Sequence, residues 1–190
     1  MAQILHVEPT PNPLAYKLVL DQNVTMGVAK NYSKKEETFD NLLAQKFFDI
    51  HGVESVFFLD NFITVTKTVG GIADFIFFQA QEIIRAAKDI VPLRETAGCQ
   101  GTSSLSQAEF ENLSGEEKLV YIDAVFDESI RPGLARDGGG LKLLGFENNV
   151  VKVRYEGACG SCPSSSAQTL NYISNLLQSR VSPHLTVLPV

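Results

Sequence analysis

The chain has 190 residues and a mass of 20.8 kDa, which suits two small domains better than one. Hydrophobic residues make up 44% and charged residues 20% of the sequence, so packed cores are expected and wholesale disorder is excluded. The net charge of −6 argues against nucleic acid or an anionic membrane surface as the main partner. Three cysteines are too few for a disulfide-rich secreted fold, and too few for a four-cysteine metal site within one chain.

The N-terminal residues bear on the compartment. Residues 1–9 contain no basic segment followed by a sustained apolar run, and no arginine-rich amphipathic leader. Nowhere do about 18 apolar residues follow one another, so we expect no transmembrane helix. These features predict a cytoplasmic protein with reduced thiols and no membrane partner.

Residues 1–92 are predicted to form the first domain. Prolines keep residues 8–13 out of a helix, and Gly52 and Gly70-Gly71 mark breaks. Two apolar stripes at helical spacing comprise Phe39, Leu42, Leu43, Phe47 and Ile50, then Ile72, Phe75, Ile76, Ile83 and Ala87. In chain order we expect a strand over 15–20, a helix over 38–50, a hairpin of 53–59 and 62–67 around Asp60-Asn61, and a second helix.

Phe57 and Phe58 are adjacent in one predicted strand, so their side chains point to opposite faces of the sheet. One of them is expected in the core. The face that holds the other is either covered by a helix or exposed, and an exposed phenylalanine there would form a docking patch for a partner.

Residues 93–113 are predicted to be a polar linker with one short helix, and residues 114–190 a second domain. Two capping-box patterns, Ser106-x-x-Glu109 and Ser114-x-x-Glu117, precede the apolar-periodic segment of the second domain. Pro132 either bends that helix or begins a new one. We then expect a hairpin of 141–146 and 150–155, a helix from Pro163, and a strand over 185–188. The fold class is α+β, with each domain a small sheet packed against two helices.

The Cys159-x-x-Cys162 motif lies at the turn between a predicted strand and the helix that begins at Pro163. Unpaired N–H groups and the helix dipole favour thiolates there, and thiolates act both as nucleophiles and as metal ligands. Two thiolates are half of a four-ligand site, so a homodimer could complete a site on its two-fold axis. Ligand counting alone does not choose iron over zinc.

The same motif also suits a thiol–disulfide oxidoreductase, although the expected elements lack the βαβ start of that fold. A third alternative is a client-binding adaptor whose first domain does the main work. Cys99, in the small-residue linker, is expected to be an incidental cysteine, because nothing basic near it lowers its pKa.

Two stretches of the second half resemble the C-terminal domain of NifU, the Nfu family. They are Ile130-Arg131-Pro132-Gly133-Leu134-Ala135-Arg136-Asp137-Gly138-Gly139 and Gly157-Ala158-Cys159-Gly160-Ser161-Cys162-Pro163. The first half resembles the N-terminal domain found in many Nfu proteins. Its matching stretches are Glu8-Pro9-Thr10-Pro11-Asn12-Pro13, Gly52-Val53-Glu54-Ser55-Val56-Phe57-Phe58 and Phe62-Ile63-Thr64-Val65-Thr66-Lys67.

The resemblance implies a non-enzymatic scaffold or carrier. It would bind a labile [4Fe–4S] cluster between two subunits through Cys159 and Cys162, and deliver it from a cluster donor to apo iron–sulfur proteins. A [2Fe–2S] cluster or zinc stays open as the bound species. Family members usually have an acidic residue where this chain has Gly140. We expect Gly140 to change local charge and flexibility rather than ligation.

Overall fold

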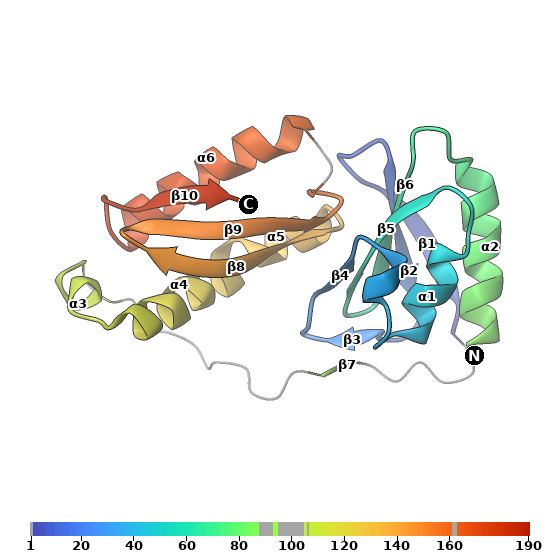
Figure 1. Ribbon diagram of the computed structural model, residues 1–190, viewed down its shortest axis with the longest axis horizontal. Helices are drawn as coiled ribbons and strands as arrows, with labels where there is room; N and C mark the ends of the chain where they lie inside the picture. Colours follow the sequence, from blue (N-terminus) through green and yellow to red (C-terminus); the bar gives the residue numbers. More distant parts are fainter. Residues whose placement is uncertain (1, 88–92, 95–104, 106, 161–162) are drawn as a thin grey trace.

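The computed structural model describes residues 2–87, 93–94, 105, 107–160 and 163–190. Two lobes lie side by side, and the end of the β8–β9 hairpin of one lobe points at the sheet of the other (Figure 1). Each lobe has its own sheet and its own hydrophobic core, in keeping with an α+β fold of two small domains. The exact domain limits at 92 and 114 stay predictions. Within the described part, no helix is both long and apolar enough to cross a bilayer.

The first lobe is built on a five-stranded sheet in the order β1-β2-β6-β5-β4, with antiparallel neighbours. Its strands are β1 (Ile4–Pro9), β2 (Ala15–Leu20), β4 (Lys30–Tyr32), β5 (Val53–Leu59) and β6 (Phe62–Lys67). A second, two-stranded sheet pairs β3 (Thr25–Met26) with β7 (Leu93–Arg94). The β5–β6 hairpin confirms the predicted turn, where Asp60 has a φ of 47°.

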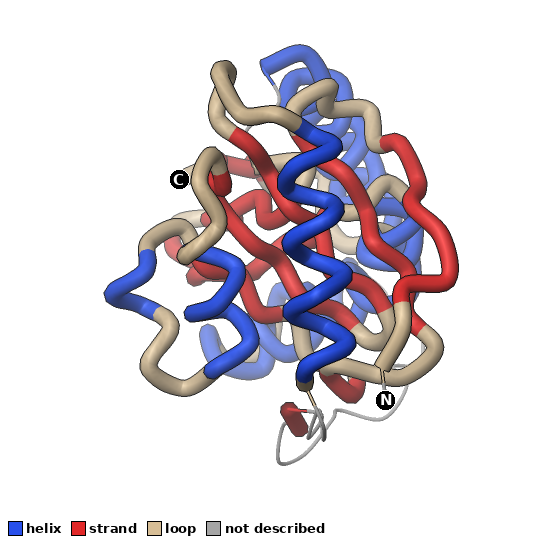
Figure 2. The backbone as a smooth tube through the Cα atoms, turned by 90° about the vertical axis from the view of Figure 1, so that its right-hand side faces the viewer, coloured by secondary structure: helices blue, strands red, loops and turns tan. Residues whose placement is uncertain are grey.

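Helices α1 (Leu42–Phe48) and α2 (Ala73–Ala86) cover one face of this sheet, and a short 3₁₀ helix (Lys35–Glu37) precedes α1. Figure 2 looks onto α2, with the strands behind it. The core between these layers includes Phe47 from α1, Phe58 and Ile63 from the sheet, and Ile84 from α2, all fully buried.

The predicted apolar faces of the two helices are wrong in part. Phe39 and Leu42 are 86% and 74% exposed. Asn41 caps α1 with its side-chain oxygen, so the helix begins four residues later than expected and Phe39 lies outside it. In α2 the buried residues are Ile76, Ala80 and Ile84, whereas the predicted Ile72 and Phe75 are exposed. The strand β1, which ends at Pro9, was not predicted.

The second lobe has a three-stranded sheet in the order β10-β9-β8. β8 (Gly139–Glu147) and β9 (Val150–Gly157) form the predicted hairpin, and β10 (Thr186–Pro189) lies parallel to β9. The helices are α3 (Gln107–Glu111), α4 (Gly115–Ser129), α5 (Arg131–Arg136) and α6 (Pro163–Arg180). Ser114 and Glu117 form the predicted capping box of α4. Ser106 lies outside the described residues.

Arg131 fixes the break between α4 and α5, where the sequence left a bend or a restart open. Its guanidinium donates to the carboxylates of Asp123 and Asp127 of α4, both at 2.6 Å. Its Nε also donates to the carbonyl of Leu141 in β8 at 3.0 Å. The chain therefore restarts as a second helix, and one side chain ties both helices to the glycine-rich start of β8.

Candidate functional site: the cysteine loop and the seam between the domains

The site begins where β8 and β9 reach the first lobe. We call the contact surface between the two lobes the seam. Gly139 and Gly157 are directly paired across the hairpin, and Gly138 and Gly157 have left-handed φ angles of 74° and 62°. The chain leaves β9 at Gly157 and turns through Ala158 to Gly160. Two backbone hydrogen bonds close the turn, from Ala158 N to Gly138 O and from Gly160 N to Gly157 O, each 3.1 Å. We call residues 157–160 the cysteine loop.

Cys159 lies in this loop, half-buried, and packs against the core of the second lobe. A Cβ at Gly139 would lie 2.4 Å from its Sγ, so only glycine at 139 leaves room for the sulfur in this position. Cys162, the second predicted ligand, and Cys99 both lie outside the described residues. Among the described residues, no group of three or more His, Cys, Asp or Glu side chains is arranged to hold a metal ion.

Two titratable groups lie in β9 just before the loop. Burial, followed by the charge of Cys159, raises the pKa of Tyr155 to about 12. Burial also raises the pKa of Glu156 above 4.5, while Lys142, Arg154 and Arg131 act in the opposite direction. The surroundings of the loop therefore disfavour added negative charge on these two neighbours of the thiol.

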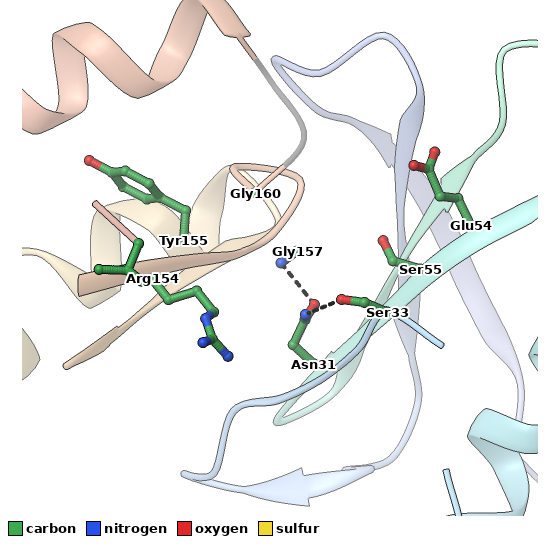
Figure 3. Close-up of a pocket in the computed structure, with 9 residues that line it drawn as sticks. Asn31, Ser33, Glu54, Ser55, Arg154, Tyr155, Gly157 and Gly160 are labelled. Carbon is green, nitrogen blue, oxygen red and sulfur yellow. Dashed lines mark hydrogen bonds between the residues drawn. The ribbon is translucent and has the colours of Figure 1, made fainter. Parts of the chain in front are cut away.

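The first lobe covers one side of the cysteine loop. The Asn12 side-chain amide donates to the Ala158 carbonyl at 3.1 Å, and the Gly157 N–H donates to Asn31 Oδ1 at 3.2 Å. The hydroxyl of Thr64 donates to the Gly138 carbonyl at 2.7 Å. Figure 3 shows the bond from Gly157 reaching across to Asn31. Asparagine and threonine side chains of one domain thus satisfy backbone groups of the other.

A cavity of about 350 Å³ lies at this seam (Figure 3). The first lobe supplies Asn31, Ser33, Glu54 and Ser55, and the second supplies Arg154, Tyr155, Gly157, Gly160 and Val190. Polar groups of both domains therefore surround the space beside the loop that carries Cys159.

The sequence pointed to Cys159 but not to Asn12, Asn31 or Thr64, which are far from it along the chain. Asn12 lies in the stretch of residues 8–13 that resembles the Nfu N-terminal domain, yet nothing local indicated that its side chain bonds to residue 158. The one signal in the sequence was the Phe57-Phe58 pair, which places one phenylalanine on each face of the sheet and left open whether the second face is covered. Both phenylalanines are fully buried, so neither forms an exposed docking patch in this structure.

Two family models match the chain in separate regions. The model described as NifU-like domain matches residues 122–188, which include the β8–β9 hairpin and the cysteine loop. The model described as scaffold protein Nfu/NifU N terminal matches residues 5–72, which include all of the five-stranded sheet except Ile4.

Curated relatives resemble the chain across both domains. The protein named NFU1 iron-sulfur cluster scaffold homolog, mitochondrial, of Drosophila ananassae is 29% identical over 92% of this chain and 59% of its own length. The human protein of the same name is 29% identical over 92% of this chain and 66% of its own length. The chain thus spans less than two thirds of the length of these relatives. The Staphylococcus aureus protein SAV1430 covers 43% of this chain and 96% of its own, at 20% identity and a TM-score of 0.39.

The prediction of a cytoplasmic location is wrong. The curated relatives that match nearly the whole chain are named mitochondrial, which contradicts it. The prediction depended on residues 1–9, and the point at which a sequence begins does not identify its compartment, because targeting segments are removed from mature chains.

The two family matches lie in the order and on the lobes that the sequence motifs indicated, and the relatives align with nearly the whole chain. The chain belongs to the NifU-like Nfu family, with an Nfu N-terminal domain followed by a NifU-like domain.

Proposed function

We propose that the protein is an iron–sulfur cluster scaffold and carrier, without catalytic turnover. Two copies would share a labile [4Fe–4S] cluster through Cys159 and Cys162 of each chain, and would pass it to apo-proteins. The cluster is the cargo of this protein. The names of the curated relatives support the scaffold role, and the ligand count supports a shared site.

The observation that carries the proposal is the position of Cys159. It lies in a short turn between β9 and α6, three residues before Cys162 in the sequence and four before the first residue of α6. Glycine at 139 accommodates the sulfur, and glycines at 157 and 160 keep the turn free of bulky side chains. A cysteine ligand on such a turn can exchange its metal without unfolding of the domain.

The alternative, a thiol–disulfide oxidoreductase, uses the same two cysteines. The topology argues against it, because an antiparallel hairpin precedes the motif and β10 joins the sheet only after α6. A redox fold of the thioredoxin kind places its motif after a βαβ start. The metal-free protein would show fast disulfide exchange, dependent on both cysteines, if this alternative were correct.

The test is anaerobic reconstitution with iron and sulfide, followed by iron analysis and mass measurement. The scaffold proposal predicts about four irons per dimer, and return to monomer on chelation. The variants Cys159→Ser and Cys162→Ser should each lose the cluster. Cys99→Ser is the matched control and should retain it. A monomer that keeps a complete cluster would refute the shared site.

A further inference from the structure

One row of residues crosses the sheet of the first lobe on the face opposite to its helices. Lys17 of β2 pairs with Thr64 of β6, Thr64 pairs with Phe57 of β5, and Phe57 pairs with Asn31 of β4. Directly paired residues of antiparallel strands project to the same face, so these four side chains form a continuous line. We call Lys17, Thr64, Phe57 and Asn31 the docking row.

Every member of the docking row contacts the second domain. Lys17 Nζ donates to the Arg136 carbonyl at 3.3 Å, and Thr64 bonds to the carbonyl of Gly138. Asn31 accepts from the Gly157 N–H. The ring of Phe57 lies against Gly140 near the start of β8 and against Gly157 at the end of β9. A Cβ at either glycine would be 2.9 Å from the ring.

The burial of Phe57 comes from this contact and not from the core of its own domain. Phe58 and Ile63 belong to the core beneath the helices, whereas Phe57 does not, although it is 0% exposed. Its described ring neighbour is Phe62, 6.1 Å away between centroids. Without the second domain, a large apolar side chain on this face would meet water, which is unfavourable.

Gly140 supports the same conclusion from the other side of the seam. Gly138 and Gly157 have left-handed φ angles that favour glycine, but Gly140 does not. The close neighbour of a Cβ at this position is the Phe57 ring, at 2.9 and 3.2 Å, and the next is Glu156 Cβ at 3.8 Å. The lack of a side chain at 140 is therefore explained by the docking of the first domain.

We propose that the docking row is an intramolecular docking surface for the cysteine loop, and that docking competes with a second copy of the chain for that loop. The metal-free chain is then a closed monomer. Its first domain must move away before two cysteine loops can face each other around one cluster. The competition rests on the proposed function, whereas the docking itself does not.

The physical basis of the competition is that both would use the same backbone. Four thiolates bound to one cluster bring two loops within a few ångströms of each other. In the closed chain, the residues that precede Cys159 are already engaged, because Ala158 and Gly157 bond to Asn12 and Asn31. A second loop cannot occupy that side until these bonds break.

The test uses Gly140→Ala in the full chain, with Gly145→Ala as matched control. Both glycines lie in β8 and neither has a left-handed φ, but a Cβ at Gly145 meets nothing within 4 Å. The alanine at 140 should push the domains apart. Exchange of the Gly157 amide hydrogen in the metal-free protein, read by NMR, should quicken about tenfold, because its acceptor Asn31 lies across the seam.

After anaerobic reconstitution, the protein concentration at which half of the loaded protein is dimeric should fall about tenfold for Gly140→Ala, and should stay unchanged for Gly145→Ala. We call this concentration the dimer midpoint. Unaltered exchange at Gly157 would overturn the docking. Faster exchange of the Gly157 amide with an unchanged dimer midpoint would overturn the competition.

If no protein, wild type included, binds a cluster, the proposed function fails and the competition with it, while the exchange measurement still decides the docking. Should Gly140→Ala fail to fold, Asn31→Ala removes one seam bond from an accessible position. Asn112→Ala serves as its control, because the Asn112 amide bonds to Ala108 in α3 and, among the described residues, to no group of the first domain. The dimer midpoint should then fall for Asn31→Ala alone, and equal midpoints would overturn the competition.

Discussion

Replacing Gly139 with alanine tests whether the position of Cys159 depends on a missing side chain. The new Cβ would lie 2.4 Å from Cys159 Sγ, 3.0 Å from the Glu156 carbonyl oxygen and 3.1 Å from Cys159 Cβ. Carbon contacts are favourable at about 3.5–4.0 Å, so the sulfur must move by about 1 Å or more. A rotation of Cys159 about χ1 relieves only the contact with Sγ, because the Glu156 carbonyl oxygen and Cys159 Cβ do not move with that rotation.

The size of the effect follows from two opposing contributions. Overpacking of a filled site costs about 1–3 kcal/mol. A glycine-to-alanine change returns about 0.4–1 kcal/mol by restricting the unfolded chain, since Gly139 has no left-handed φ. We therefore expect Gly139→Ala to lower the free energy of unfolding by about 1–2 kcal/mol. For Gly145→Ala, where a Cβ meets nothing, the same reasoning predicts a change between zero and a gain of about 1 kcal/mol.

Thermal unfolding of the two metal-free variants, followed by calorimetry, measures this difference. In a domain of 60–100 residues, 1 kcal/mol shifts the melting temperature by about 4–8 °C, so the two variants should differ by about 10 °C. The transition that shifts should be that of the second domain. Equal melting temperatures for the two variants would refute the reasoning, because they would show that the sulfur does not occupy the space above Gly139.

Three further predictions concern stability. Arg131→Met removes the bonds to Asp123, Asp127 and Leu141, and should lower the free energy of unfolding in urea by about 2 kcal/mol. Thr66→Val should be neutral or stabilising by up to about 1 kcal/mol in the same assay, because its buried hydroxyl has no hydrogen-bond partner among the described residues, and a clear loss would reveal one. Burial raises the pKa of Glu156, so the unfolded chain releases this proton first, and stability should fall as the pH rises from about 4.5 through the raised value. Glu156→Gln should remove that fall: unfolding at pH 4 and pH 7 should differ less in the variant than in the wild type, and equal differences would contradict the assignment.

Local chemistry explains which elements could be predicted from the sequence. Both hairpins have turn residues that tolerate left-handed φ, namely Asp60 in the first domain and Asn148 and Asn149 in the second. The capping box at Ser114 is likewise a contact between residues three apart. Such features depend on a few neighbouring residues, so the sequence contains all the information they need.

The prediction of the apolar faces of α1 and α2 failed for a different reason. Hydrophobic periodicity indicates that a helix has an apolar face. Capping and tertiary packing determine where the helix begins and which of its residues face the core. In α1, Asn41 accepts from the N–H groups of Leu43 and Ala44, which leaves Phe39 outside the helix. In α2, a run of apolar residues offers several faces, and the sheet selected the one that contains Ile76, Ala80 and Ile84.

The cover over the cysteine loop could not be predicted, because the bonds that form it join residues 126 and 146 positions apart. The cysteine motif gives the number of ligands in each chain. It does not indicate which backbone groups beside the cysteines already form hydrogen bonds. The sequence showed that Gly140 replaces the acidic residue usual in the family, and this suggested a local change of charge and flexibility. In the structure, its neighbour is a phenylalanine of the other domain.

Gly139 and Gly140 together connect the thiol to the domain seam. Consecutive residues of a strand face opposite sides of the sheet, so the position that accommodates Cys159 Sγ is followed by the one on which the Phe57 ring rests. A shift of this end of β8 on one side therefore displaces the contact on the other. If Cys159 moves to bind a cluster, the end of β8 at Gly139 and Gly140 shifts with it. The contact between Gly140 and the Phe57 ring is then weakened, and the first domain loses part of its docking surface. Binding of the cargo and release of the domain would then be two consequences of one displacement.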